Sequence, residues 1–147
     1  MERLPKKPTA KNPPQNFTGD VWVDAIHSPR ADGQRGSSAK VRFSPGAHTN
    51  WHSHALGQTL YVTEGVGLVR SRGGEVLEIH PGDIVYTPPG QEHWHGATPV
   101  DFMEHLALMD VPDDPSSATT WLEAVSDDEY LAAASAVLPV DPSAHRA

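Results

Sequence analysis

Two short stretches of the sequence hold side chains that can bind a metal ion. The first holds His52 and His54, with Gln58 four residues further on, and the second holds His93. Residues two apart on a strand project from the same face, so the first two imidazoles can reach one ion. We expect a bend at residues 55–57 to bring in Gln58, and we expect His93 to come from a strand across a barrel. The sequence therefore predicts one interior metal centre with these four ligands.

Two further histidines can carry protons beside such a centre. His95 lies two residues after His93 on the same strand face, so it can line the pocket without acting as a ligand. A free imidazole that titrates near neutrality is a general acid or base, and His105 is a second candidate for this role. Structural alternatives stay open for each residue: three unrelated strand histidines, a Gln58 outside the ligand set, a His95 that only hydrogen-bonds a group behind the ligands, and a structural His105.

The donor set and the composition narrow the chemistry. Three neutral imidazoles and one amide leave the charge of a bound ion uncompensated, which makes it a stronger Lewis acid. Such a set suits Mn, Fe, Ni, Zn or Cu, and the sequence does not choose among them. The absence of cysteine excludes thiolate ligands and nucleophiles. The net charge of −8, from 11 basic and 19 acidic residues, argues against nucleic acid and anionic membranes as partners.

The elements that must position these side chains are short strands. Apolar and polar residues alternate at 39–43, which is the pattern of a half-buried strand. Similar runs, separated by turns rich in glycine and proline, are expected at residues 21–26, 59–63, 66–70, 75–79, 84–87, 93–97 and 102–109. Many short strands at this spacing predict an all-β sandwich or barrel.

The two ends of the chain differ from this central region. The prediction divides the chain into a flexible arm at 1–16, a barrel at 17–110, a helical segment at 111–138 and a disordered tail at 139–147. Ser126 and Glu129 have the spacing of a capping box, which predicts a short helix that begins near Asp127. We also expect an earlier helical turn within residues 121–125.

The two metal-binding stretches, taken with their glycines and prolines, resemble the two signature motifs of the cupin family. The first motif, G-x5-H-x-H-x3-Q-x6-G, runs from Gly46 to Gly65, and the second, G-x5-P-x-G-x2-H, runs from Gly82 to His93. The resemblance implies the cupin double-stranded β-helix, a jelly-roll barrel, here with an N-terminal extended arm and a short C-terminal helix. The implied metal ligands are His52, His54, Gln58 and His93. Gln58 stands where the common cupin pattern has Glu.

Within the cupins, the chain more closely resembles the bacterial manganese-dependent hydroxynitrile lyases, the (R)-mandelonitrile lyase-like cupins, over residues 17–130. The resemblance implies manganese as the metal, with iron, zinc or nickel as alternatives, and cleavage of a cyanohydrin to an aldehyde and cyanide. It places His95 and His105 in the pocket, where they are the candidate catalytic residues. The candidate substrate-binding residues are Ala39, Val41, Met103 and Met109. Met103 is included because it shares a strand face with His105, and Met109 stands where we expect Gln in the active lyases.

Two other classes of function fit the same residues. A three-histidine metal with open positions can bind oxygen, as in a cupin dioxygenase, and a cupin can also bind a small molecule without turnover. We expect a small-molecule substrate, no nucleic acid, no membrane, and a homodimer or homotetramer in which the N-terminal arm covers a partner's sheet edge. The sequence shows no secretory signal and no membrane-spanning stretch, so we expect a cytoplasmic protein.

Overall fold

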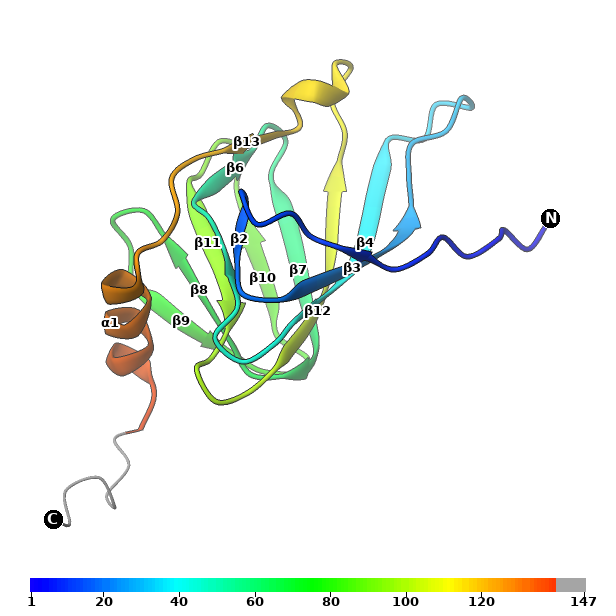
Figure 1. Cartoon of the computed structure of the whole chain (residues 1–147). Coiled ribbons are helices and arrows are strands. Elements are labelled where there is room, and N and C mark those ends of the chain that lie inside the picture. Colours follow the sequence, from blue (N-terminus) through cyan, green and yellow to red (C-terminus); the bar gives the residue numbers. More distant parts are fainter. Residues whose placement is uncertain (140–147) are drawn as a thin grey trace, which may run out of the picture.

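Two curled antiparallel β-sheets that face each other make up most of the protein (Figure 1). The computed structural model describes residues 1–139, so most of the tail predicted at 139–147 lies outside the described residues. The strands are β1 (Ala10–Lys11), β2 (Phe17–Thr18), β3 (Val21–His27), β4 (Gly36–Phe43), β5 (His48–Thr49), β6 (His52–His54), β7 (Gln58–Gly65), β8 (Gly67–Ser71), β9 (Val76–Ile79), β10 (Ile84–Thr87), β11 (His93–Ala97), β12 (Met103–Asp110) and β13 (Thr119–Trp121). A 3₁₀ turn at Pro115–Ser117 and helix α1 (Asp127–Val137) complete the fold, which confirms the predicted jelly-roll barrel with a short C-terminal helix.

The first sheet contains six strands in the order β1, β3, β4, β12, β7, β10. Val41 of β4 pairs with His105 of β12, and both side chains are buried, whereas the next pair, Lys40 and Leu106, is only half-buried. This period of two is the pattern predicted for residues 39–43. It gives β4 and β12 a row of side chains that face the barrel interior.

The second sheet contains β13, β6, β11, β5 and β2 in this order, and β8 and β9 extend it from the other edge of β11. Helix α1 covers its outer face, at the left of Figure 1. Trp51 and Trp94 are almost fully buried in one cluster with Tyr130 and Ala133 of the helix. These two tryptophans, although they flank the candidate ligands in sequence, therefore pack beneath the helix.

Helix α1 begins where the sequence predicts. Ser126 Oγ accepts a hydrogen bond from the Glu129 N–H at 3.1 Å, and the Glu129 carboxylate accepts one from the Ser126 N–H at 3.3 Å. The two bonds close the capping box and satisfy two donors that the first helical turn leaves free.

The segment before the helix differs from the prediction. Thr119, Thr120 and Trp121 form a strand that pairs with β6, and the helical turn expected within residues 121–125 is wrong at this point. The β-branched threonines favour an extended chain, and the free edge of β6 supplies hydrogen-bond partners that an isolated helical turn lacks. The segment predicted as helical at 111–138 therefore contains a strand before helix α1.

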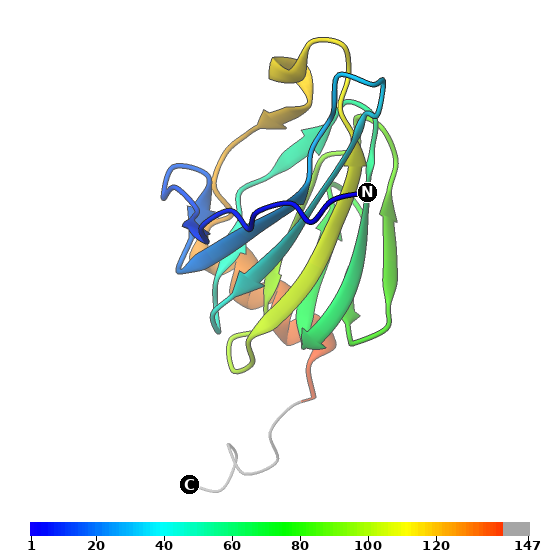
Figure 2. The same cartoon turned by 90° about the vertical axis from the view of Figure 1, so that its right-hand side faces the viewer.

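The N-terminal arm lies along the edge of the first sheet. Its strand β1 pairs with β3 of the same chain, Ala10 with Val23 and Lys11 with Trp22, so it covers this chain's own sheet edge. Figure 2 shows the arm from the side of this sheet. Within residues 1–139, no helix is long and apolar enough to cross a membrane.

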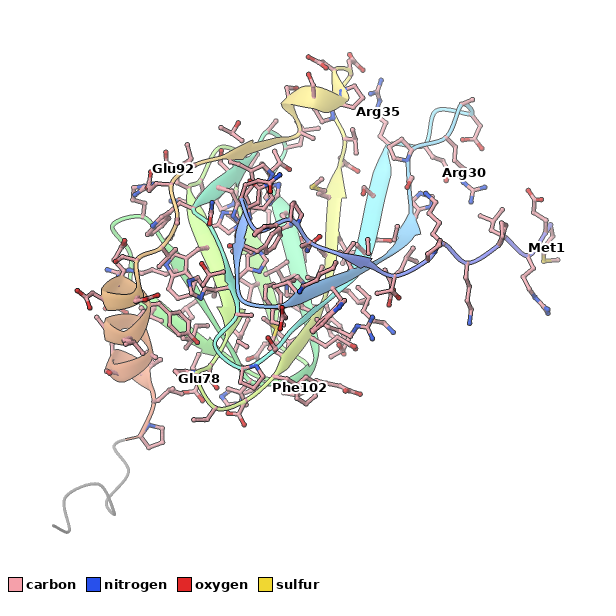
Figure 3. The ribbon with its side chains drawn as sticks, in the orientation of Figure 1. Met1, Arg30, Arg35, Glu78, Glu92 and Phe102 are labelled. Atoms are coloured by element: carbon pink, nitrogen blue, oxygen red, sulfur yellow. The ribbon has the colours of Figure 1, made fainter. Side chains whose placement is uncertain are left out.

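Residues labelled in Figure 3 lie at the two ends of the barrel. Arg35 lies at one end, and Glu78 and Phe102 lie at the other. Strand β12 begins next to Phe102, and the residue after it, Val111, donates a backbone hydrogen bond to Arg35 O at 2.9 Å. Strand β12 therefore runs along the whole length of the barrel, from one end to the other.

Candidate metal centre

Three histidines meet inside the barrel because two strands of the second sheet are neighbours. His52 of β6 is the direct cross-strand partner of His93 of β11, and their ring centroids are 4.2 Å apart. The ring of His54 lies 5.0 Å from that of His52 and 5.4 Å from that of His93. The expectation that His93 comes from a strand across the barrel is wrong, because the jelly-roll connection places β11 beside β6 in one sheet.

Gln58 is the candidate ligand that comes from the opposite sheet. It is the first residue of β7, and a turn at Gly57, with a φ of +78°, carries the chain from β6 into this strand. The Gly57 N–H donates to His54 O at 3.2 Å and holds the turn closed. The buried side chain of Gln58 then lies against His54. The bend at residues 55–57 thus returns the chain to the histidines.

Each of the three candidate ligand rings is held through its Nδ1 atom. The contacts are His52 Nδ1 to Asn50 O at 2.9 Å, His93 Nδ1 to Gln91 O at 3.0 Å and His54 Nδ1 to Thr119 Oγ1 at 3.1 Å. A carbonyl oxygen can only accept, so it fixes the proton of His52 and His93 on Nδ1 and leaves their Nε2 lone pairs free. The Thr119 hydroxyl can accept or donate, and it orients the His54 ring. With Nδ1 held in this way, Nε2 is the nitrogen available to a metal.

Buried atoms without partners lie where the candidate ligands meet. His54 Nε2, His93 Nε2 and Gln58 Oε1 are buried, and none has a hydrogen-bond partner. An unpaired buried polar atom costs about 1–3 kcal/mol, so three of them in one place indicate a missing ligand. Imidazole nitrogens with an amide oxygen suit a first-row divalent cation. The residues present therefore fit the predicted metal.

Burial also keeps the candidate ligand rings unprotonated. It lowers the pKa of His93, and together with repulsion from His93 it lowers the pKa of His54 to about 4 and that of His52 well below 6.5. A metal binds only the unprotonated ring nitrogen. These rings are already unprotonated at pH 7, so they can bind a metal ion without first releasing a proton.

His95 lies close enough to compete with His54 for the ion. Ring nitrogens of His52, His93 and His95 lie within 4.8 Å of one another, and this tight group omits His54. The environments of the two rings differ. His54 has an unpaired Nε2 and touches Gln58, whereas His95 Nδ1 shares a hydrogen bond of 3.1 Å with His105 Nε2. These contacts favour His54 as the ligand and His95 as its neighbour.

The pair formed by His95 and His105 is buried and uncharged at neutral pH. Burial lowers the pKa of His105 to about 4, and burial with repulsion from His105 lowers the pKa of His95 well below 6.5. The interpretation of His95 as a group that titrates near neutrality is therefore wrong for the metal-free protein, because its ring is enclosed among other imidazoles. At pH 7 both rings of the pair are therefore unprotonated.

The candidate pocket residues occupy different parts of the barrel. Val41 and Ala39 of β4 pair with His105 and Ala107 of β12, so they face the interior beside His105. Met103 is fully buried in the apolar core, next to the Phe102 end shown in Figure 3. Met109 lies six residues further along β12, at the Arg35 end. The structure thus separates the two methionines.

Two cavities reach the candidate ligands from different sides. One, of about 380 Å³, is lined by Gln58, Met109 and Tyr86 among other residues. The second, of about 140 Å³, is lined by His93 and Val85 among others. A small molecule can therefore approach the centre next to Gln58, and Met109 stands at that entrance.

Sequence reasoning missed two side chains that contact the candidate ligands. Thr119 and Trp121 lie on β13, where they are the cross-strand partners of His54 and His52. Thr119 Oγ1 contacts His54 Nδ1, and the ring of Trp121 lies 4.8 Å from that of His52. The two-residue spacing of Thr119 and Trp121 matches that of the histidines, but only the tertiary pairing shows that they meet.

Comparison with known proteins places this architecture in one class. A jelly-roll barrel with histidines in its interior is typical of cupins, and the family model described as "Cupin domain" matches residues 39–105. The chain is 44% identical over 130 residues to (R)-mandelonitrile lyase from Granulicella tundricola, a match that covers 88% of this chain and 97% of that protein. The chain belongs to the cupin family.

Solved structures agree with this assignment. A cupin-like protein from Thermotoga maritima superposes with a TM-score of 0.79 at 33% identity, over 90% of this chain and 97% of that one. A predicted oxalate decarboxylase from the same organism superposes with a TM-score of 0.64 at 21% identity, over 71% of this chain and 92% of that one. The second similarity shows the shared fold alone.

Proposed function

We propose that the protein is a metal-dependent enzyme that cleaves cyanohydrins to an aldehyde and cyanide, as a hydroxynitrile lyase does. The observation that carries this proposal is the 44% identity to (R)-mandelonitrile lyase across nearly the whole of that protein. The buried set of unpaired nitrogen and oxygen atoms supports a metal at the same place. Manganese is the proposed ion, with iron, zinc or nickel as alternatives, and a small cyanohydrin is the proposed substrate.

The proposed ligands are His52, His54, Gln58 and His93. A divalent ion held by them would supply Lewis acidity that lowers the pKa of the substrate hydroxyl. The chain itself supplies the group that takes the proton. His95 lies beside the ligands, is neutral at pH 7, and has its Nδ1 atom oriented by the 3.1 Å hydrogen bond to His105.

The proton and electron movements of the reaction balance within this pair. Nε2 of His95 accepts the hydroxyl proton while the oxygen electrons form the carbonyl bond and the bond to the nitrile carbon breaks. Cyanide leaves with that electron pair and takes the proton back from His95 as hydrogen cyanide. His105 accepts a hydrogen bond from the Nδ1–H of His95 and so stabilises the transient positive charge. Ala39 and Val41 place apolar side chains beside His105, where they would contact the organic part of the substrate.

The experiment is the release of benzaldehyde from mandelonitrile by protein loaded with Mn²⁺. Chelator-treated protein and a His52→Ala variant serve as controls, and metal content is measured for each sample. We expect turnover only in the loaded wild-type protein. We also expect His95→Ala to retain the metal and to lose turnover by about 10²-fold or more. Loaded protein without turnover would contradict the lyase proposal, and full activity of His95→Ala would remove that residue from the mechanism.

A further inference from the structure

The segment that follows the barrel, residues 118–123, runs along the strand that carries two of the proposed ligands. Its backbone hydrogen bonds to residues 51–55, at 2.8 to 3.0 Å, are Ala55 N–H to Ala118 O, Trp51 N–H to Glu123 O and Leu122 N–H to Trp51 O. Between them, β13 pairs with β6 so that Thr119 lies opposite His54 and Trp121 lies opposite His52. The segment therefore encloses both histidines of β6 from the outer edge of the sheet.

The three proposed ligand histidines are held in two different ways. His52 and His93 each contact a backbone carbonyl two residues earlier in the chain, which no substitution of a side chain removes directly, and His52 Nδ1 also lies 3.4 Å from Thr49 Oγ1. The Nδ1 atom of His54 instead contacts a side chain, the hydroxyl of Thr119, at 3.1 Å. This contact comes from a residue 65 positions further along the chain. Among these three rings, His54 alone makes its Nδ1 hydrogen bond with the segment after the barrel.

The contact decides which nitrogen of His54 faces the centre. When Thr119 Oγ1 accepts a hydrogen bond from the Nδ1–H of His54, the Nε2 lone pair is left free, and this Nε2 is buried without a partner. Groups that hydrogen-bond the far nitrogen of a ligand histidine fix its tautomer and ring orientation. Trp121 adds a packing contact on the neighbouring ring, 4.8 Å from His52 at an interplanar angle of 33°.

We propose that Thr119 is a positioning residue of the metal centre, which sets the orientation of the His54 ring from strand β13. The inference rests on the proposed function only in taking His54 as a metal ligand. It gives the segment after the barrel a part in metal binding, although none of its side chains is a proposed ligand.

The test compares three substitutions on β13. Thr119→Val keeps the shape of the side chain and removes the hydroxyl, Thr119→Ser keeps the hydroxyl, and Thr120→Val makes the matched change at the exposed neighbouring position. Affinity for Mn²⁺ alone is measured from the free ion during titration of chelator-treated protein. We expect Thr119→Val to weaken binding by about 10- to 100-fold. Thr119→Ser and Thr120→Val should bind as the wild type does.

The outcomes separate positioning from a general loss of structure. Equal affinity of Thr119→Val and Thr120→Val would overturn the proposal. If Thr119→Val also lowers the melting temperature of the chelated protein, Thr119→Ser decides: restored affinity supports the proposal and weak affinity overturns it. No substrate is present, so inactivity toward cyanohydrins would leave this result intact. A wild-type protein that binds no Mn²⁺ would overturn the metal centre itself.

Discussion

The surroundings of each interior histidine ring divide these residues by role. The rings of the proposed ligands meet one another between β6 and β11, and the ring of His95 hydrogen-bonds another imidazole. His48 belongs to neither group, although its Nδ1 atom also contacts a backbone carbonyl. Its Nδ1–H donates to Gly46 O at 2.9 Å, and its ring stacks on Tyr130 at 4.3 Å, beneath helix α1. The same side chain thus serves binding, proton transfer and packing within one small barrel.

His48 should make the stability of the protein depend on pH. Burial lowers its pKa below 6.5, so near and below pH 6.5 the unfolded chain takes up a proton that the folded protein does not. The free energy of unfolding therefore falls as the pH drops, and this contribution is fully present only above about pH 6.5. His48→Phe retains a stacked ring without a titrating group. Its stability should decline less steeply with acid, by up to about 1.4 kcal/mol per pH unit.

Urea unfolding of chelator-treated protein between pH 8 and pH 5 measures this difference. The other buried histidines contribute equally to both proteins, so the comparison isolates one ring. If the free energy of unfolding falls equally with acid in the wild type and in His48→Phe, then His48 takes up a proton in the folded protein as readily as in the unfolded chain. That result would contradict the prediction. Above pH 7 the variant should be less stable by about 1 kcal/mol, because it lacks the hydrogen bond to Gly46.

Residue types and strand spacing were sufficient to predict that His52 and His54 lie on one strand face, because their two-residue separation is a local property. The neutral state of His95 could not be predicted in this way. Its pKa depends on complete burial beside His105, and both conditions arise from tertiary packing. The positioning contact of Thr119 has the same origin.

At the scale of elements, the turn between β6 and β7 connects the two sheets at the proposed metal centre. Gly57 has a φ of +78°, and a Cβ atom there would lie 2.8 Å from Thr87 O of β10. Any other residue would strain the backbone and push against a neighbouring strand. The turn thus requires glycine for two independent reasons, and Gln58 follows it directly.

Gly57→Ala should therefore damage both the fold and the site. A positive φ costs an L-residue about 1–2 kcal/mol, and the contact with Thr87 O adds to this and displaces Gln58. Gly73→Ala is the matched control, because Gly73 has a φ of +77° and open space around its Cβ position. Both variants should lose stability in thermal unfolding, Gly57→Ala more so, and only Gly57→Ala should bind Mn²⁺ more weakly. Equal Mn²⁺ affinity of the two variants would contradict this role of the turn.

The predictable elements are those whose pattern is local. The strands expected at residues 84–87 and 93–97 match β10 and β11, and the capping box places the start of α1. Strand β13 was not predictable, because three residues carry no periodicity and it exists through its pairing with β6. The pairing of β6 with β11 was missed for the same reason, because the local sequence does not determine which distant strands pair.

At the scale of the whole molecule, the centre depends on both sheets and on the segment that follows them. The second sheet supplies His52, His54 and His93, the first sheet supplies Gln58 and His105, and β13 closes the outer edge. An ion bound by the folded protein and not by the unfolded chain stabilises the fold as its concentration rises above the dissociation constant. Metal binding should thus hold the two sheets together at this end of the barrel.

The most direct test of this account is the metal content per chain after loading with Mn²⁺ and removal of free ion. Wild-type protein, His54→Ala and His95→Ala are compared. We expect one ion per chain in the wild type and in His95→Ala, and almost none in His54→Ala. The reverse pattern, with His54→Ala loaded and His95→Ala empty, would contradict the proposed ligand set and make His95 the third histidine ligand.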